Sequence, residues 1–229
     1  MTIQERVQAA REAIAAAAAA AGRSEEEICL VAATKMNDAA AVRQAIAAGV
    51  DACGENRVQE LVEKQAQGAY TGVPVHFIGH LQRNKVNKVV GACDLIQSVD
   101  SEVLLRMISA RAECLGLVQD ILLEVNIGGE AAKSGAAPAE LPRLLDILGT
   151  LPALRLRGLM TIPPIMEKSG GNRKYFQAMY KLFVDIRAKK YDNSAMDTLS
   201  MGMSADYADA ILEGATMVRL GTALFGPRT

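Results

Sequence analysis

The sequence predicts one (β/α)8 barrel that occupies the whole chain, residues 1–229. Short apolar runs of strand length alternate with longer helical runs, and such alternation is typical of parallel strands covered by helices. The alternation repeats eight times. Because a barrel of this type takes about 250 residues, nothing remains for a second domain. No G-x-G-x-x-G motif follows the first strand, which disfavours the alternative, an open doubly wound sheet.

A helix is expected at the N-terminus, over residues 1–22, and is expected to pack on the barrel. It is predicted to end at Gly22. Its apolar stripe consists of Ile3, Val7, Ala10 and Ile14. The alanine run 15–21 could also belong to a secretory signal peptide, but Glu5 and Glu12 interrupt the basic region that such a peptide requires. We therefore favour the surface helix.

The strands and helices of the barrel follow from the two hydrophobic periods. Strands are predicted over residues 28–33, 50–53, 75–78, 95–99, 121–125, 156–160, 199–201 and 217–220. Helices are predicted over residues 38–48, 55–67, 81–90, 102–115, 139–148, 173–189 and 205–212. Glycines follow most of these helices, as expected for helix C-caps. Gly170 and Gly171 indicate a mobile loop over residues 166–173.

Composition and charge exclude several classes of protein. Half of the residues are hydrophobic, so the chain is not intrinsically disordered. Lys and Arg number 25, Asp and Glu number 26, and the net charge of −1 argues against binding of nucleic acid through a basic surface. No run of about 18 strongly apolar residues is present, so no membrane span is expected.

The cysteines and histidines do not predict a metal site. The four cysteines are Cys29, Cys53, Cys93 and Cys114. They form no CxxC pair, so we expect them to be buried and reduced, in a cytoplasmic protein. His76 and His80 have an HxxxH spacing, but they straddle a strand and a turn, and no third ligand is evident. We expect His76 to be a satisfied strand residue, whereas His80 could face a pocket.

Polar side chains at the carboxyl ends of the strands are the candidates for function, because the active groups of such barrels lie there. Lys35 stands out, since it follows a wholly apolar strand and would lie partly desolvated at the barrel mouth. Desolvation lowers the pKa of a lysine, and an uncharged amine is what a Schiff base with an aldehyde requires. The alternative is an ordinary solvated lysine, and Lys35 by itself does not decide between the two.

The loops after the last two strands are candidate phosphate sites, as is frequent in such barrels. The segment 200–204, Ser-Met-Gly-Met-Ser, leads into a helix whose first amides would face an anion. Gly221 allows close approach of the backbone, and Thr222 adds a hydroxyl donor. Each loop taken singly could consist of ordinary cap and turn residues. Together with Lys35 they predict a phosphorylated aldehyde as ligand, and pyridoxal phosphate is the obvious one.

Three further residues could touch this ligand. If Arg219 reaches the pyridine nitrogen, that nitrogen stays unprotonated, which makes the cofactor a weak electron sink. The alternative for Arg219 is a surface salt bridge. Glu55 and Asn56 could orient the cofactor, or they could cap the helix that follows them.

Several segments, in the same order along the chain, resemble the pyridoxal phosphate homeostasis proteins. They are residues 30–35, 54–60, 77–85, 133–135, 157–163, 199–204 and 217–226. The resemblance implies a barrel like the N-terminal domain of alanine racemases, with pyridoxal phosphate held as an internal aldimine on Lys35. It also implies phosphate contacts from Ser200, Gly221 and Thr222, with Arg219 near the pyridine ring. The expected cofactor-binding set is Lys35, Asn56, His80, Met160, Ser200, Met203, Arg219, Gly221 and Thr222.

The resemblance implies a protein that takes part in vitamin B6 balance without an established catalytic reaction. We expect a monomer that supplies pyridoxal phosphate to pyridoxal phosphate-dependent apoenzymes and has no catalytic residue. Thr34, Met36 and Arg57 depart from the family pattern, where Ser, Thr and Tyr are common. None of these departures removes a group that the Schiff base needs.

A fold-type III enzyme such as an amino-acid racemase is the alternative. A racemase needs a base on each face of the substrate α-carbon, and Lys35 could serve one face. In alanine racemases the opposite base is a tyrosine from a second domain, whereas none of the five tyrosines here lies at a predicted strand end. His80 would be the best substitute. A class I aldolase-like barrel is weaker still, because no acid/base pair of carboxylates accompanies Lys35.

Overall fold

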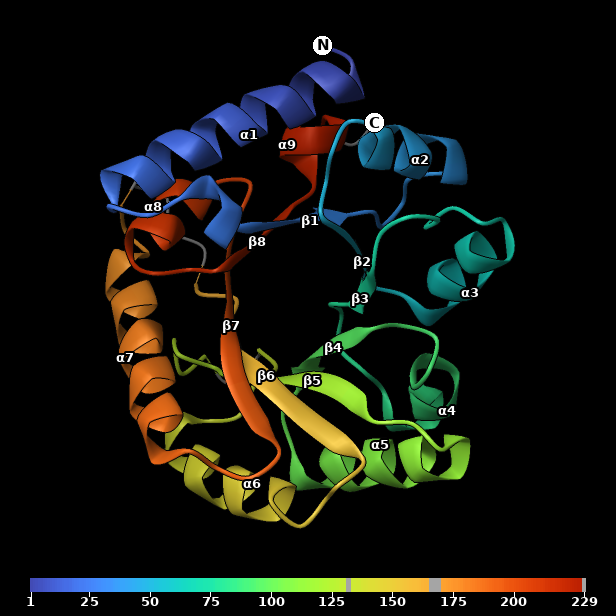
Figure 1. The fold of residues 1–229 in the computed structure, drawn as a ribbon, viewed down its shortest axis with the longest axis vertical. Coiled ribbons are helices and arrows are strands. Elements are labelled where there is room, and N and C mark those ends of the chain that lie inside the picture. Colours follow the sequence, from blue (N-terminus) through green and yellow to red (C-terminus); the bar gives the residue numbers. More distant parts are fainter. Residues whose placement is uncertain (131–132, 165–169, 228–229) are drawn as a thin grey trace.

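Eight parallel strands form a closed barrel in the computed structural model, which describes residues 1–130, 133–164 and 170–227 (Figure 1). The strands are β1 (Cys29–Ala33), β2 (Ala52–Glu55), β3 (Val75–Phe77), β4 (Leu95–Val99), β5 (Gln119–Glu124), β6 (Leu154–Met160), β7 (Ser194–Met203) and β8 (Met217–Leu220). Each strand pairs with the next one in sequence, and β8 closes the barrel on β1, where Arg219 lies opposite Val31. The predicted (β/α)8 barrel is therefore confirmed.

Helices surround the barrel on its outside (Figure 1). They are α1 (Ile3–Ala20), α2 (Ala39–Ala47), α3 (Val58–Ala66), α4 (Val86–Val89), α5 (Glu102–Leu115), α6 (Leu141–Leu148), α7 (Arg173–Lys189), α8 (Tyr207–Leu212) and α9 (Thr222–Phe225). Short 3-10 turns add η1 (Glu25–Glu27), η2 (Arg83–Lys85) and η3 (Pro138–Glu140). The long helices are amphipathic, and α5 for example buries Leu105, Ile108 and Ala112 on one face.

Helix α1 crosses the outside of the barrel and contacts α2, α8 and α9 (Figure 1). It begins with a capping box between Thr2 and Glu5, which satisfies two amides of the first turn. Val7 and Ile14 are buried on its inner face. Because α2 and α9 come from distant parts of the chain, α1 links the elements on both sides of the β8–β1 closure.

The structure differs from the predicted boundaries at several places. Glu55, which the pattern places in a helix, ends β2, because its side chain is buried among donors outside the barrel. The helix predicted over 81–90 divides into η2 and α4. Strand β7 begins at Ser194 instead of residue 199, because exposed side chains interrupt the apolar run in its first half. The single turn of α9 is too short to give a hydrophobic period and is not predicted.

The barrel interior is packed and is not a channel. Its apolar layer consists of Val31, Ala52, Leu95, Leu122, Met160 and Met217. A larger apolar core lies between the barrel wall and the helices. Buried polar side chains complete the interior, among them His76, Gln97, Ser200 and Arg219. A ligand at the mouth would therefore contact packed side chains of the barrel interior.

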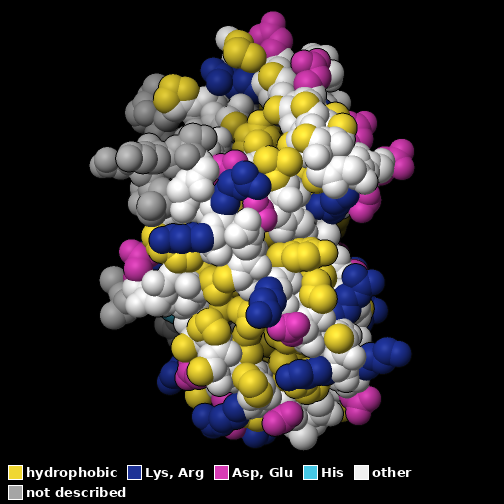
Figure 2. Space-filling view, turned by 90° about the vertical axis from the view of Figure 1, so that its left-hand side faces the viewer, with side chains coloured by type: hydrophobic (Ala, Val, Ile, Leu, Met, Phe, Trp, Pro, Cys, Tyr) yellow, Lys and Arg dark blue, Asp and Glu magenta, His cyan; other side chains and the backbone are white. Residues whose placement is uncertain are grey.

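The outer surface mixes charges of both signs. Figure 2 shows the left-hand side of Figure 1, where α7 lies, and basic and acidic side chains are interspersed there among hydrophobic ones. Within the described residues, no helix is long and apolar enough to cross a membrane. Nor does any group of three or more His, Cys, Asp or Glu side chains in the described ranges have an arrangement that could hold a metal ion.

The cysteines lie apart from the mouth of the barrel and are free thiols. Burial raises the pKa of Cys29, Cys53 and Cys93 to about 12, so these thiols are protonated and unreactive. Cys114 is exposed, which differs from the predicted burial, because it lies on the outer side of α5. Of the loop predicted over 166–173, residues 166–169 lie outside the described residues, and residues 170–172 form a turn that leads into α7.

Candidate functional site

Lys35 lies just beyond the end of β1, at the mouth of the barrel. The alternation along β1 directs positions 31, 33 and 35 toward the interior. Lys35 is half-buried and lines two cavities, of about 530 Å³ and about 320 Å³. The larger cavity lies toward β2 and β3 and includes Asn56, Phe77 and His80. The smaller cavity lies toward β8 and includes Gly221 and Thr222. The structure thus brings five of the predicted cofactor-binding residues together.

Arg219 is a cation inside the barrel, and only 4% of it is exposed. Its Nη2 donates to Thr161 O at 2.9 Å, and its Nη1 donates to Ser200 Oγ. Ser200 Oγ donates to Gln97 Oε1 at 2.7 Å. Gln97 Nε2 in turn lies 3.0 Å from His76 Nδ1. A chain of hydrogen bonds therefore holds Arg219 from beneath.

This chain also sets the protonation of its members. Burial lowers the pKa of His76 to about 4, so the imidazole is neutral and its Nδ1 can accept from Gln97. Burial lowers the pKa of Arg219 to about 10, and the nearby charge of Glu124 opposes that shift, so the guanidinium remains charged. Arg219 therefore does not form the surface salt bridge that is the alternative for it.

Glu124 ends β5 with a buried carboxyl group. Burial raises its pKa to about 7, with a further contribution from the negative charge of Asp100, whereas the charge of Arg219 lowers it. A carboxyl group that titrates near neutral pH can hold or release a proton at the mouth. Sequence reasoning assigns no role to Glu124, and its place at a strand end is the signal that could have identified it.

The loop between β8 and α9 joins the loop after β7 through Ser204. The backbone amides of Gly221 and Ala223 both donate to Ser204 Oγ, each at 3.2 Å. Thr222 is the first residue of α9. The family resemblance implies phosphate contact by Ser200, but the structure encloses Ser200 in the interior and places Ser204 against Gly221.

Asn56 and His80 lie on the opposite side of Lys35 from this loop. Asn56 Oδ1 is buried and has no hydrogen-bond partner among the described residues. The absence of a side chain at Gly79 allows the close packing here, because a Cβ at that position would lie 2.2 Å from Asn56 O. His80 Nδ1 lies 3.2 Å from Ser134 Oγ. Asn56 is not a helix cap, since the N-cap residue of α3 is Arg57.

The two predicted methionines have different surroundings. Met160 is enclosed in the apolar layer of the interior. Met203 ends β7 and is exposed, and its amide donates to Asp206 Oδ1 at 2.8 Å. Of the two, only Met203 is accessible to a ligand at the mouth.

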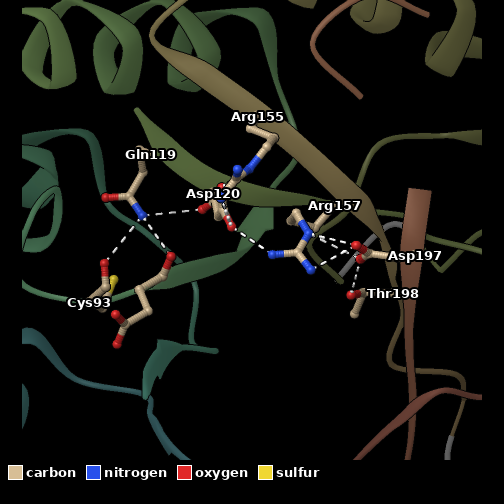
Figure 3. Close-up of polar contacts among 8 residues, drawn as sticks. Cys93, Gln119, Asp120, Arg155, Arg157, Asp197 and Thr198 are labelled. Carbon is tan, nitrogen blue, oxygen red and sulfur yellow. Dashed lines mark hydrogen bonds and ion pairs between the residues drawn. The ribbon is translucent and has the colours of Figure 1, made fainter. Parts of the chain in front are cut away.

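The amino-terminal end of the barrel carries a network of ion pairs instead (Figure 3). Asp120 accepts from Arg155 Nε at 2.6 Å and from Arg157 Nη1 at 2.8 Å. Arg157 Nη2 also lies 2.7 Å from Asp197 Oδ2. Burial acts to raise the pKa of Asp120, but hydrogen bonds from Arg155 and Arg157 hold it below its usual value. These ion pairs contribute to stability, and Arg157 and Asp197 also line a cavity of about 860 Å³ at this end.

The model of the family described as alanine racemase, N-terminal domain, matches residues 6–229. Together with the closed barrel and the lysine beyond its first strand, this match places the protein in the alanine racemase barrel class. The pyridoxal phosphate homeostasis protein of Aquifex aeolicus is 41% identical over 100% of this chain and 99% of its own. The protein of that name from Pseudomonas aeruginosa is 42% identical over 99% of this chain and 96% of its own.

A solved structure agrees with these relatives. PipY of Synechococcus elongatus PCC7942, with pyridoxal phosphate bound, is 34% identical and has a TM-score of 0.85. The match covers 98% of this chain and 100% of PipY. This chain therefore belongs to the pyridoxal phosphate homeostasis proteins of the alanine racemase N-terminal domain family, as the resemblance of its motifs implies. These curated relatives are named as homeostasis proteins and not as enzymes.

Proposed function

We propose that this protein binds pyridoxal phosphate through a Schiff base on Lys35 and acts in vitamin B6 homeostasis, supplying the cofactor to pyridoxal phosphate-dependent apoenzymes. The observation that carries the proposal is the position of Lys35, between two cavities at the barrel mouth. The names of the relatives and the pyridoxal phosphate bound to PipY support it. The bond forms when the lysine amine attacks the aldehyde carbon and water leaves.

The donors around Gly221 fit the phosphate group of this cofactor. In the structure the amides of Gly221 and Ala223 point at one acceptor oxygen, the hydroxyl of Ser204. A phosphate oxygen would replace that acceptor, and the Ser204 hydroxyl would then donate to it. Thr222 offers a further hydroxyl from the same loop. In this arrangement Ser200 acts indirectly, by holding Arg219.

Arg219 fits the pyridine ring of the cofactor. Its contacts with Ser200 and Thr161 use two of its N–H donors, and a guanidinium has five. It would donate a hydrogen bond to the pyridine nitrogen without protonating it, because its pKa of about 10 makes it a poor acid. A ring held in this way stabilises carbanions weakly, which suits a protein that holds the cofactor. Asn56, His80 and Met203 complete the proposed binding set, and Met160 would support the site from the apolar layer of the interior.

Borohydride trapping tests the proposed attachment. Reduction of the protein incubated with pyridoxal phosphate should fix the label on Lys35, and a mass spectrum of the digest locates it. Lys35→Ala should lose the label. Lys85→Ala should keep it, because Lys85 lines the same cavity but does not follow β1. A label elsewhere, or a wild-type protein that stays colourless with pyridoxal phosphate, would disprove the attachment.

A protein that supplies pyridoxal phosphate and an amino-acid racemase are expected to differ in their reactions with amino acids. None of the five tyrosines lines either cavity beside Lys35, so these walls lack the second base of alanine racemases. Incubation with single L-amino acids in deuterium oxide should therefore give no rapid α-deuteration and no D-isomer. Transfer of pyridoxal phosphate to an apoenzyme should proceed even when a scavenger removes the free cofactor. Rapid deuteration, or transfer abolished by the scavenger, would contradict the supplying role.

A further inference from the structure

We propose that Glu55, Glu60 and Lys64, three charged side chains on the outside of the barrel wall, form a clamp that positions Lys35. None of the three lines either cavity beside Lys35. The bonds from Lys64 and Glu60 go to the peptide groups on either side of Lys35, so we treat the three as positioning residues. The measurements of pyridoxal phosphate binding rest on the proposed function. The contacts that form the clamp do not depend on it.

The two peptide groups on either side of Lys35 are both held by side chains of α3. Lys64 Nζ donates at 2.8 Å to Thr34 O, the carbonyl of the peptide group before Lys35. The amide of Met36, in the peptide group after Lys35, donates to Glu60 Oε2 at 2.7 Å. Lys64 and Glu60 are themselves paired at 3.2 Å, one helical turn apart. The backbone of Lys35 is thus held from both directions by one ion pair.

The clamp is anchored on a buried carboxylate. Glu55 is 0% exposed, and its Oε1 accepts from Lys64 Nζ at 2.7 Å, from Tyr70 OH at 2.9 Å and from Thr34 Oγ1. Burial and the charge of Glu55 raise the pKa of Tyr70, so the phenol keeps the proton that it donates. Lys64 is only 6% exposed. A buried ion pair gains little stability, because the loss of hydration offsets the attraction, so we assign this one to fixing geometry.

The backbone that the clamp holds is otherwise unfavourable. Met36 has φ of 62°, in the left-handed region that residues other than glycine rarely adopt. Its side chain does not hold it there, because Met36 is 65% exposed. The turn is closed by Asn37 N, which donates to Thr34 O at 3.1 Å, and the bond from the Met36 amide to Glu60 adds a restraint from α3. Loss of the Glu60 bond would loosen the turn that carries Lys35 while leaving β1 in the barrel.

Substitution of Glu60 is the sharpest test. Replacing Lys64 would leave the Glu55 carboxylate buried without a cation, which destabilises the whole fold. Glu60→Ala removes the acceptor of the Met36 amide and one of the two partners of Lys64, which keeps Glu55, and Glu60→Gln keeps an acceptor oxygen. Glu63→Ala, an exposed position on the same helix, is the matched control. Each variant is compared with wild type by hydrogen exchange of the Met36 amide without cofactor, and by titration with pyridoxal phosphate and the absorption band of its Schiff base.

In Glu60→Ala we expect exchange of the Met36 amide and the Kd for pyridoxal phosphate to rise about tenfold, the effect of losing one charge-assisted hydrogen bond. The Schiff-base band should shift or weaken, whereas Glu60→Gln and Glu63→Ala should behave like wild type. Unchanged exchange at Met36 in Glu60→Ala would disprove the clamp whether or not the protein binds cofactor. Faster exchange with an unchanged Kd and band would show that the clamp does not position Lys35. Absence of any band in wild type would refute the proposed function, and the exchange result would still decide the clamp.

Discussion

At the scale of single residues, Glu124 stands out among the acids that the structure describes, because its surroundings oppose its charge. It is 6% exposed, and burial together with the negative charge of Asp100 raises its pKa from 4.5 to about 7. The folded protein therefore retains a proton that the unfolded chain releases at lower pH. The stability contributed by this proton is fully present below pH 4.5 and is lost as the pH rises through about 7.

Glu124→Gln should remove this dependence. Because glutamine resembles the protonated carboxyl group, the variant should gain about 3 kcal/mol in free energy of unfolding above pH 7. At pH 4.5 and below, the variant and wild type should unfold at nearly the same denaturant concentration. Glu63→Gln, on the exposed face of α3, should show neither effect. An equal change in stability at both pH values would contradict the assigned pKa.

At the scale of elements, β6 and β7 approach each other closely at Gly158. The register of the two strands shifts between Leu156 and Gly158, and Gly158 has φ of 154°. A Cβ at this position would lie 1.8 Å from Thr198 O, a backbone atom of the neighbouring strand. Neither strand can yield without breaking its ladder, so this glycine is required by the packing of two strands and not by a turn.

Gly158→Ala should therefore lower the free energy of unfolding by about 3 kcal/mol or more, as overpacking against a fixed backbone does. Gly149→Ala is the control, because Gly149 at the end of α6 has a helical φ of −57° and a Cβ there would meet nothing closer than 3.5 Å. That substitution should be neutral or stabilising by up to about 1 kcal/mol. Denaturant unfolding measures the stability of both variants. Equal losses of unfolding free energy in the two variants would contradict the close approach of β6 and β7 at Gly158.

The same scale shows why some elements could be predicted and others could not. The eight strands follow from local runs of apolar residues, and each predicted strand overlaps an observed one. The end of β2 depends on Glu55 meeting Lys64 and Tyr70, which lie 9 and 15 positions further along the chain. The hydrophobic periodicity around Glu55 does not report these distant contacts, so the sequence pattern wrongly begins the next helix at Glu55.

In the candidate site, too, some residues could be predicted from the local sequence and others could not. Lys35 can be identified locally, as a polar residue that follows an apolar strand. The contact between Ser204 and Gly221 spans 17 positions, and the bond between Ser200 and Gln97 spans 103. Which serine faces the mouth and which one holds Arg219 is therefore decided by barrel closure. Sequence reasoning places both serines in one loop without separating their surroundings.

At the scale of the whole molecule, the two ends of the barrel have different chemistry. The carboxyl ends of the strands bring together residues whose side chains line cavities, such as Lys35, Asn56 and Thr222. At the amino ends, Asp120 and its two arginines are bonded to one another across β5 and β6 (Figure 3). Stability and binding should therefore respond separately to substitutions at the two ends.

Asp120→Asn tests this separation, because it removes one negative charge that accepts from both Arg155 and Arg157. Arg155 is half-exposed, so solvent weakens its share, and we expect a loss of about 1–2 kcal/mol in the free energy of unfolding at neutral pH. The folded-state pKa of Asp120 lies below the usual 3.8, so this contribution is present above pH 3.8 and disappears as the pH falls further.

Titration of Asp120→Asn with pyridoxal phosphate should give the wild-type Kd. Glu102→Gln, which weakens the more exposed ion pairs of Glu102 with Arg106 on α5 and Arg143 on α6, should cost less stability than Asp120→Asn. A weaker Kd in Asp120→Asn would show that the two ends are coupled through the strands.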